Sequence, residues 1–396
     1  MKRPPNSYAL ISVRVITEKN ILNDAYIKWK DGRIVEYGTM ETYQNNESLM
    51  EWNMGGKFIA APGFIDLHIH GSNGADVMDC NEQALQTISS SLVKEGTTAF
   101  LATTITNSKE KITSALKSVN QYINKTADTQ IGSQLLGVHL EGPFINSIRA
   151  GAQPLEHIYS PCLDTFQQFQ LASGNHIKIV TMAPEMPNGY LLVKKLSESG
   201  IIASIGHSDA LYEEMILAME AGAKHVTHLY NGMRGSHHRE PGVVGASLAH
   251  PELMLELIAD GIHVHPAVIK ATYLAKGANG LILITDAMRA KWLEDGEYEL
   301  GGQRVFVKNN TARLQDGTLA GSVIKMNVAV TNMMDFTGCT LQEAIRMASI
   351  NPARQLKLDH QKGSIALGKD ADIVILDTDL NVKMTFIKGE LVYKGD

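Results

Sequence analysis

The sequence is poor in cysteine and lacks long apolar runs, and each shortage excludes a class of protein. Only three cysteines occur among 396 residues, at Cys80, Cys162 and Cys339. Because their number is odd and they lie far apart, we expect no disulfide framework and no cysteine-based zinc knuckle, and a reducing compartment is favoured. No stretch of about 18 apolar residues occurs, so no membrane-spanning helix is expected.

Basic runs are also missing. The formal net charge is −6 and no long Lys/Arg segment interrupts the sequence. A phosphate backbone requires a basic face, so nucleic acid is excluded as the main partner. Residues 1–10 are polar, contain two prolines and have no apolar core, which argues against a signal peptide. We therefore expect a soluble cytoplasmic protein.

Both ends of the chain have the pattern of a small β-domain. Residues 8–60 alternate between apolar and polar side chains in short runs, and Asp31-Gly32 is a strong hairpin signal. This pattern predicts antiparallel strands with one solvent-facing side. Short strand-like runs return after Gly363. We expect residues 1–60 and 360–396 to form one small β-sandwich domain.

The middle of the chain has a different rhythm, in which near-continuous apolar runs alternate with amphipathic, helix-like stretches. Eight such runs predict a parallel sheet closed into a (β/α)8 barrel of the TIM type over residues 61–359. The alternative is an open doubly wound sheet, but no Gly-x-Gly-x-x-Gly motif follows the first strand. An insert at 292–318 reads as β-hairpins, and 340–348 and 352–357 read as helices. The eight runs are 64–70, 97–105, 135–141, 177–183, 201–207, 225–230, 254–260 and 281–286.

The first of these strands carries two histidines on one side. Because side chains alternate along a strand, His68 and His70 point the same way, and Leu67 and Ile69 point the other way. Packing explains paired imidazoles at the end of an apolar strand poorly, whereas imidazole is a good ligand for divalent transition metals.

Similar side chains end several of the other strands. In a parallel barrel the carboxyl ends of the strands share one rim, where the chemistry is located. Buried groups of this kind are costly unless they are paired or bind an ion, so the convergence predicts a metal site. We expect two divalent ions, with His68 and His70 on one, His207 and His228 on the other, and Glu141 as the bridge. The strand-ending candidates are His68, His70, Glu141, His207, His228 and Asp286.

Asp286 is the expected general base. A carboxylate beside a metal-activated water can take its proton and later deliver it to a leaving amine, and Asp286 can serve as a metal ligand as well. His139, one layer deeper, is expected to support a metal ligand from behind or to belong to the core. We expect Asp66 to support the metal ligands in the same way and His225 to be structural. The loop 231–242, with Arg234 and Arg239, forms a local anion site or is paired with Glu240 and solvent.

Several motifs resemble the amidohydrolase superfamily. The resemblance begins with segment 62–70 (PGFIDLHIH) and the tail 363–374 (GSIALGKDADIV). Within that superfamily, further motifs resemble those of the deacetylases that act on phosphorylated amino sugars. These motifs are 139–144 (HLEGPF), 206–209 (GHSD), 227–231 (THLYN), 239–242 (REPG), 259–263 (ADGIH), 285–286 (TD) and 319–322 (LAGS).

The resemblance implies hydrolysis of the acetyl amide of N-acetylglucosamine 6-phosphate, giving glucosamine 6-phosphate and acetate. It also implies that Glu141 replaces the carboxylated strand-4 lysine of many relatives, since Lys178 stands at the wrong end of that strand. Arg239 and His263 would hold the phosphate, and the phosphate site would be completed across a homodimer interface. Gln153 stands where some members have histidine, so the resemblance leaves open whether this residue polarises the carbonyl group. The implied substrate contacts are Ala152, Gln153, Asn231, Gly232, Arg239, His263, Leu319, Ala320 and Gly321.

Two alternatives stand beside this expectation. One is another amidohydrolase that acts on a different N-acyl amino sugar or a cyclic amide; such a substrate, if unphosphorylated, would leave Arg239 and His263 without a partner. The other is a catalytically silent scaffold, whose signature would be lost ligands, and all the expected ligands are present. Imidazole and carboxylate suit zinc, iron, manganese and cobalt alike.

Overall fold

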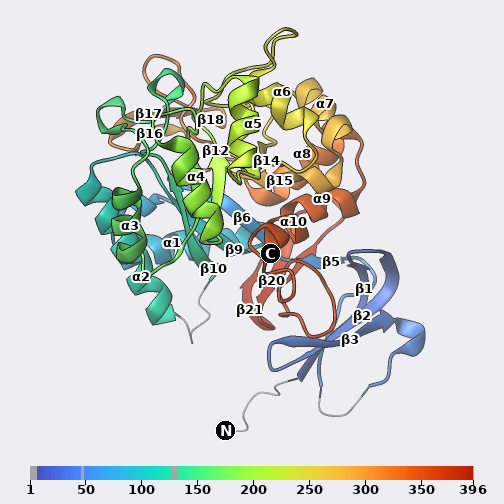
Figure 1. The fold of residues 1–396 in the computed structure, drawn as a ribbon. Helices are drawn as coiled ribbons and strands as arrows, with labels where there is room; N and C mark the ends of the chain where they lie inside the picture. Colours follow the sequence, from blue (N-terminus) through green and yellow to red (C-terminus); the bar gives the residue numbers. More distant parts are fainter. Residues whose placement is uncertain (1–6, 46–48, 127–131, 396) are drawn as a thin grey trace.

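A barrel of eight parallel strands forms the centre of the computed structural model, which describes residues 7–45, 49–126 and 132–395. The strands follow one another in chain order around the sheet, so the predicted barrel is confirmed (Figure 1). They are β6 (Phe64–Ile69), β9 (Thr97–Thr104), β10 (Gln134–Glu141), β11 (Ile177–Met182), β12 (Ile202–Ile205), β13 (His225–Val226), β14 (Met254–Ile258) and β15 (Leu281–Ile284).

The seam between the first and last strands is joined just beyond the end of β15. The Asp286 backbone N–H donates to the His68 carbonyl at 2.8 Å, and the His70 N–H donates to the Ala287 carbonyl at 2.9 Å. These bonds bring the end of β15 beside the His68–His70 segment. A candidate base and two candidate ligands from opposite ends of the barrel sequence thus become neighbours.

Four strands end two or more residues earlier than the apolar runs predicted. The runs were expected to continue to residues 207, 230, 260 and 286, but β12, β13, β14 and β15 end at Ile205, Val226, Ile258 and Ile284. His207, His228 and Asp286 have positive φ angles of 46°, 28° and 47°. A non-glycine residue in this region cannot continue a β-ladder and is held there only by its surroundings. Three candidate site residues therefore leave the strand geometry just where they reach the rim.

Helices cover the outside of the barrel. The amphipathic stretches predict three of them: α1 spans Glu82–Leu92, α2 spans Lys109–Thr126 and α4 spans Gly189–Glu198. The remaining helices are α3 (Leu163–Ala172), α5 (Tyr212–Glu220), α6 (Gly242–Ala249), α7 (Pro266–Lys276), α8 (Met326–Thr337), α9 (Leu341–Ala348) and α10 (Ile350–Gln355). No helix within the described ranges is long and apolar enough to cross a membrane.

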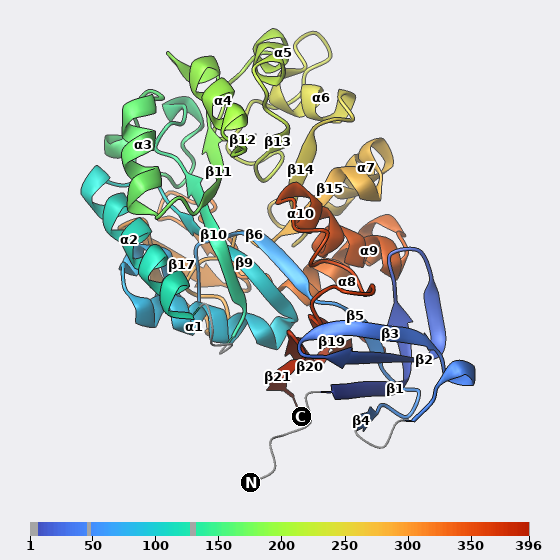
Figure 2. The same ribbon diagram turned by 60° about the horizontal axis from the view of Figure 1, so that its bottom comes forward.

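The two ends of the chain share a second sheet, which lies below the barrel in Figure 2. It joins β1 (Ser7–Ile16), β2 (Ile21–Lys30), β3 (Arg33–Thr39), β4 (Met50–Asn53) and β5 (Ile59–Pro62) to β19 (Ile373–Leu376), β20 (Val382–Ile387) and β21 (Glu390–Lys394). The hairpin at Asp31-Gly32 is confirmed, but β4 and β5 run parallel to β1, so the expectation of antiparallel strands alone was wrong. Parallel pairing arises because the chain crosses over before returning to β1.

This sheet has an apolar core of its own, in which the Trp29 and Phe386 rings meet edge to face at 5.5 Å. The domain boundaries at residues 60 and 360 stay a prediction. The expectation that no signal peptide is present concerns residues 1–10, and residues 1–6 of that segment lie outside the described part of the chain.

The insert after β15 folds as predicted into an antiparallel sheet of β16 (Gly296–Leu300), β17 (Gln303–Lys308) and β18 (Thr311–Arg313). It reaches the candidate site through Gln303, whose amide donates to the Ala152 carbonyl at 2.6 Å.

Candidate active site and metal centre

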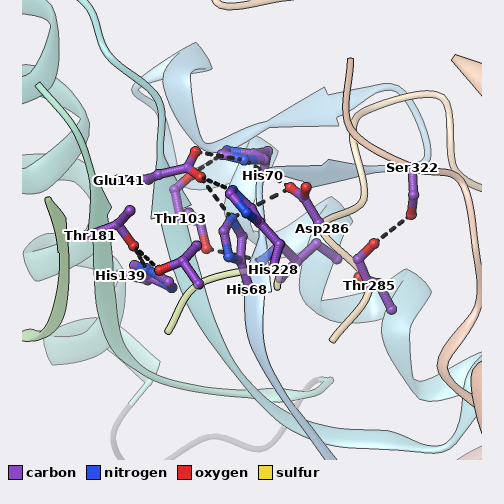
Figure 3. A network of polar contacts seen from close by, with 12 residues as sticks. His68, His70, Thr103, His139, Glu141, Thr181, His228, Thr285, Asp286 and Ser322 are labelled. Atoms are coloured by element: carbon purple, nitrogen blue, oxygen red, sulfur yellow. Dashed lines mark hydrogen bonds and ion pairs between the residues drawn. The ribbon is translucent and has the colours of Figure 1, made fainter. Parts of the chain in front are cut away.

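Four imidazoles converge on one carboxylate at the carboxyl end of the barrel. The Nε2 atoms of the four histidines lie 3.0–3.4 Å from the carboxylate oxygens of Glu141. Figure 3 shows three of the rings gathered around Glu141 and Asp286. The four are His68 at 3.4 Å, His70 at 3.3 Å, His207 at 3.4 Å and His228 at 3.0 Å.

Asp286 completes the cluster from the other side of the seam. Its Oδ1 lies 3.4 Å from His68 Nε2 and 3.2 Å from His70 Nε2. Among the residues that the structure describes, three sets of buried donor atoms are close enough to hold a metal ion; one, His68, His139 and Glu256, lies behind the rim, and the other two contain Glu141. Of these two, one consists of His68, His70 and Glu141, and the other of Glu141, His207 and His228. This grouping is the one expected for two ions with Glu141 between them.

Three of the rings are held by their far nitrogen. His68 Nδ1 lies 3.0 Å from Glu256 Oε2, His70 Nδ1 lies 3.2 Å from the Thr103 carbonyl, and His207 Nδ1 lies 2.8 Å from the Arg149 carbonyl. Oxygen acceptors of this kind require a proton on Nδ1, which leaves Nε2 to face Glu141. This is the usual arrangement of metal-binding histidines, in which the outer partner fixes the ring and its tautomer.

The electrostatics of the cluster favour positive charge. Burial lowers the pKa of His68, but the charges of Asp286, Glu141 and Glu256 outweigh it and raise that pKa well above its usual value. His70 behaves in the same way, and its pKa rises to about 9. Burial raises the pKa of Asp286, but the charge of His68 and the hydrogen bond from His70 hold it below its usual value. Asp286 is therefore a carboxylate at neutral pH.

The donor set fits a divalent cation. His68 Nε2 is fully buried and makes no hydrogen bond, although carboxylate oxygens of Glu141 and Asp286 lie 3.4 Å away. A nitrogen lone pair aimed at two carboxylates is unfavourable unless a cation or a proton lies between them. Imidazole nitrogens and carboxylate oxygens in this number suit a divalent transition metal.

A cavity of about 370 Å³ opens above this cluster. It is lined by most of the residues that the resemblance implies for substrate contact, including Ala152, Gln153, Asn231, Gly232, His263, Leu319 and Gly321. Ala320 is fully buried between two lining residues and does not line the cavity. The insert contributes Leu300 and Arg313, which the sequence did not indicate.

Both the oxygen and the nitrogen of the Gln153 side-chain amide form hydrogen bonds with protein partners. Its Nε2 donates to Glu141 Oε2 at 2.7 Å, and its Oε1 accepts from the Thr106 N–H at 2.9 Å. The side chain thus orients Glu141 from the cavity wall.

The two expected phosphate ligands differ in placement. His263 faces the cavity, and its ring is fixed by a 2.6 Å contact between Nδ1 and Asp260 Oδ2. Arg239 is exposed, with its Nη1 2.8 Å from His238 Nε2, and it is absent from the cavity lining. Within one chain, His263 lines this cavity and Arg239 does not.

The neighbouring candidates lie outside the cluster. Burial and the charge of His68 lower the pKa of His139 to about 3, and its ring contacts the Leu67 carbonyl and the Thr181 hydroxyl. Asp66 accepts from the Thr285 hydroxyl at 2.6 Å and from the His68 N–H at 3.2 Å. His225 Nε2 lies 3.1 Å from Glu256. Lys178, at the start of β11, is exposed.

Sequence reasoning missed Glu256. This carboxylate is fully buried in the strand MLELI and contacts His68, His225 and the backbone of His228. An ionisable residue in the middle of an apolar strand is itself a signal, because such a charge is stable there only with partners.

Comparison with known proteins places the chain in a family. The model of the "Amidohydrolase family" matches residues 59–392. The chain is similar to an N-acetylglucosamine-6-phosphate deacetylase of Bacillus subtilis, with 45% identity over 98% of this chain and 97% of the relative. It is also similar to an N-acetylgalactosamine-6-phosphate deacetylase of Escherichia coli O157:H7, with 36% identity over 97% and 99% of the two chains.

A solved structure has the same fold over nearly the whole chain. It is a variant of N-acetyl-D-glucosamine-6-phosphate deacetylase from Mycobacterium smegmatis in complex with N-acetyl-D-glucosamine-6-phosphate. The TM-score is 0.91 at 28% identity, covering 98% of this chain and 100% of that one. The barrel, the histidine–carboxylate cluster and these matches agree: the chain belongs to the amidohydrolase family, a family of metal-dependent hydrolases.

Proposed function

We propose that this protein hydrolyses the acetyl amide of N-acetylglucosamine 6-phosphate, giving glucosamine 6-phosphate and acetate. The observation that carries the proposal is the convergence of four imidazoles and Asp286 around Glu141, beside a cavity that Glu141, Asp286 and three of the four histidines line. The named activity of relatives at up to 46% identity supplies the substrate. The cavity has the size of a small-molecule site.

We propose two ions per chain. The residues that would hold them are His68, His70 and Glu141 for one, and Glu141, His207 and His228 for the other. When bound, such ions supply Lewis-acid polarisation of the acetyl carbonyl and a water of lowered pKa. The nitrogen and oxygen donors suit zinc, iron(II), manganese and cobalt alike.

Asp286 moves the protons. Its carboxylate takes a proton from the attacking water, because it is ionised at neutral pH and lines the cavity. It then donates that proton to the amide nitrogen, so that glucosamine 6-phosphate leaves as an amine. Its position is fixed by the backbone, since its N–H donates to the His68 carbonyl and its carbonyl accepts from the Ser322 N–H, both at 2.8 Å.

The phosphate is bound by His263 and by an arginine from a second copy of the chain. Because Arg239 is exposed and does not line the cavity of its own chain, it is available to the cavity of a partner subunit. A homodimer then has two complete phosphate sites. Charge-assisted hydrogen bonds from arginine and histidine are the strongest available for a phosphate. We place this enzyme in the cytoplasm, where sugar phosphates occur.

The test is a comparison of acetate release from phosphorylated and unphosphorylated sugars. N-Acetylglucosamine 6-phosphate should be hydrolysed with a kcat/KM well above that of free N-acetylglucosamine. N-Acetylgalactosamine 6-phosphate is the second candidate, because the Escherichia coli relative bears that name. A higher kcat/KM for the galacto epimer would replace the proposed substrate, and no release from any of the three would refute the function.

A further inference from the structure

Glu256 is the centre of a buried hydrogen-bond network behind the candidate metal ligands. It lies in β14 and is completely buried. Its Oε2 is 3.0 Å from His68 Nδ1 and accepts from the His228 backbone N–H at 3.2 Å. Its Oε1 is 3.1 Å from His225 Nε2. One carboxylate thus contacts a histidine from each of the two candidate ligand sets.

The partners on the far side determine where the protons lie. The Gln355 amide Nε2 is 2.9 Å from His225 Nδ1, so that amide donates to a ring nitrogen that accepts. His225 therefore carries its proton on Nε2 and donates it to Glu256. His68 carries its proton on Nδ1, because the Glu256 carboxylate oxygen that faces this nitrogen can only accept.

The consequence for His68 concerns its other nitrogen. With Nδ1–H directed at Glu256, Nε2 presents a lone pair toward Glu141 and Asp286, each 3.4 Å away. The backbone around Glu256 is held as well, because its carbonyl accepts from the Leu229 N–H at 2.9 Å, next to His228. The strand that carries Glu256 therefore joins the two ligand sets.

We propose that Glu256 is a positioning residue of the metal centre: it fixes the His68 imidazole in its ion-binding tautomer and orientation. It acts through His68 and does not touch the ion or the sugar. A carboxylate behind a ligating imidazole also makes that imidazole a stronger donor, and such partners contribute about 10- to 100-fold in metal affinity. The inference rests on the metal centre of the proposed function.

Glu95 provides a matched control. It is also a fully buried carboxylate, but its partner is Lys291, with Oε1 and Nζ 2.6 Å apart, and it contacts none of the candidate ligands. Changing Glu95 to Gln removes a buried charge without touching His68. A purely structural role for Glu256 would make the two substitutions equivalent in metal binding.

Two substitutions at Glu256 separate the hydrogen bond from the charge. In Glu256→Gln, the amide oxygen can still accept from His68 and from the His228 backbone, while the amide nitrogen faces His225. The His225 proton then moves from Nε2 to Nδ1, and the Gln355 amide rotates so that its oxygen accepts that proton. Glu256→Leu removes the acceptor. The experiment is equilibrium binding of Zn²⁺ alone to the full chain with a competing chelator, and the His68-side ion is defined as the one lost in His68→Gln/His70→Asn.

We expect the affinity for that ion to fall about tenfold in Glu256→Gln and about 100-fold in Glu256→Leu. Glu95→Gln should bind zinc as the wild type does, even though it unfolds at a lower temperature. Wild-type affinity in Glu256→Gln and in a folded Glu256→Leu would overturn the proposal, as would an equal loss in Glu95→Gln.

A second measurement on the wild type does not depend on the variants folding. In the zinc-loaded protein, ¹H–¹⁵N spectra of the histidine side chains should place the His68 proton on Nδ1, protected from exchange; a proton on Nε2 would overturn the proposal. Since no sugar is involved, these outcomes are separate from the proposed activity. A protein that binds zinc as expected but releases no acetate would refute the function and leave Glu256 in its role.

Discussion

Replacing Asp286 with asparagine should abolish most of the turnover and leave substrate binding almost intact. Asparagine keeps the shape of the side chain. The hydrogen bonds that hold residue 286 to His68 and Ser322 are made by its backbone, so the substitution leaves them in place. What is lost is the ionised oxygen, which lies 3.2 Å from His70 Nε2 and at neutral pH is ready to take a proton. A positioned acid–base group contributes about 10²–10⁴-fold to the rate, or roughly 2.7–5.4 kcal/mol of barrier.

The assay is steady-state release of acetate from N-acetylglucosamine 6-phosphate by wild type and Asp286→Asn, with the metal content of each preparation measured in parallel. We expect kcat to fall by at least about 100-fold while KM changes by less than about threefold. Equal metal content is the control, because Asp286 also lies near the ions. A kcat within about tenfold of the wild type at equal metal content would refute its role as the base.

Three further results are expected. The double substitution His68→Gln/His70→Asn should lower the zinc content of reconstituted protein from two ions per chain to one, as measured by elemental analysis; a wild type that saturates at one ion would contradict this. Arg239→Ala should lower kcat/KM for the phosphorylated sugar by about 10- to 100-fold and spare the free sugar; mixing it with Asp286→Asn subunits should restore activity if the arginine acts across a dimer. Glu95→Gln should lower the free energy of unfolding by roughly 3–5 kcal/mol in denaturant titrations, because it leaves a buried lysine unpaired; a loss below about 1 kcal/mol would contradict that.

The barrel could be predicted from the sequence because its strands are almost entirely buried and consist largely of apolar residues. β9 and β15, for example, contain only buried residues. Strand ends could not be predicted in the same way. His207, His228 and Asp286 follow apolar runs, but each leaves the ladder with a positive φ, which hydrophobic pattern does not encode.

The parallel placement of β4 and β5 beside β1 was missed because strand direction depends on the path of the connecting chain. Alternation of apolar and polar residues identifies a strand but is the same in both directions.

The candidate ligands could be found because the barrel topology brings strand ends to one rim, whatever their separation in sequence. What supports them could not. In the sequence Glu256 is a single charge in an apolar strand. Its contacts with His68 and His228 depend on which residues of the other barrel strands its side chain meets in the folded protein. The exposure of Arg239 depends in the same way on the path of a loop, so its distance from His263 could not be read from spacing.

The most direct test of a metal-dependent deacetylase is a titration of metal-free protein with one divalent ion, in which bound metal and acetate release from N-acetylglucosamine 6-phosphate are followed together. Zinc, manganese and cobalt should be tried separately. Activity should be absent without metal and should rise in proportion to the occupied sites, while Glu141→Gln, which disrupts both ligand sets, should bind poorly and stay inactive at the same metal concentrations. Full activity in the metal-free protein, or metal binding with no acetate release under any of these ions, would contradict the account.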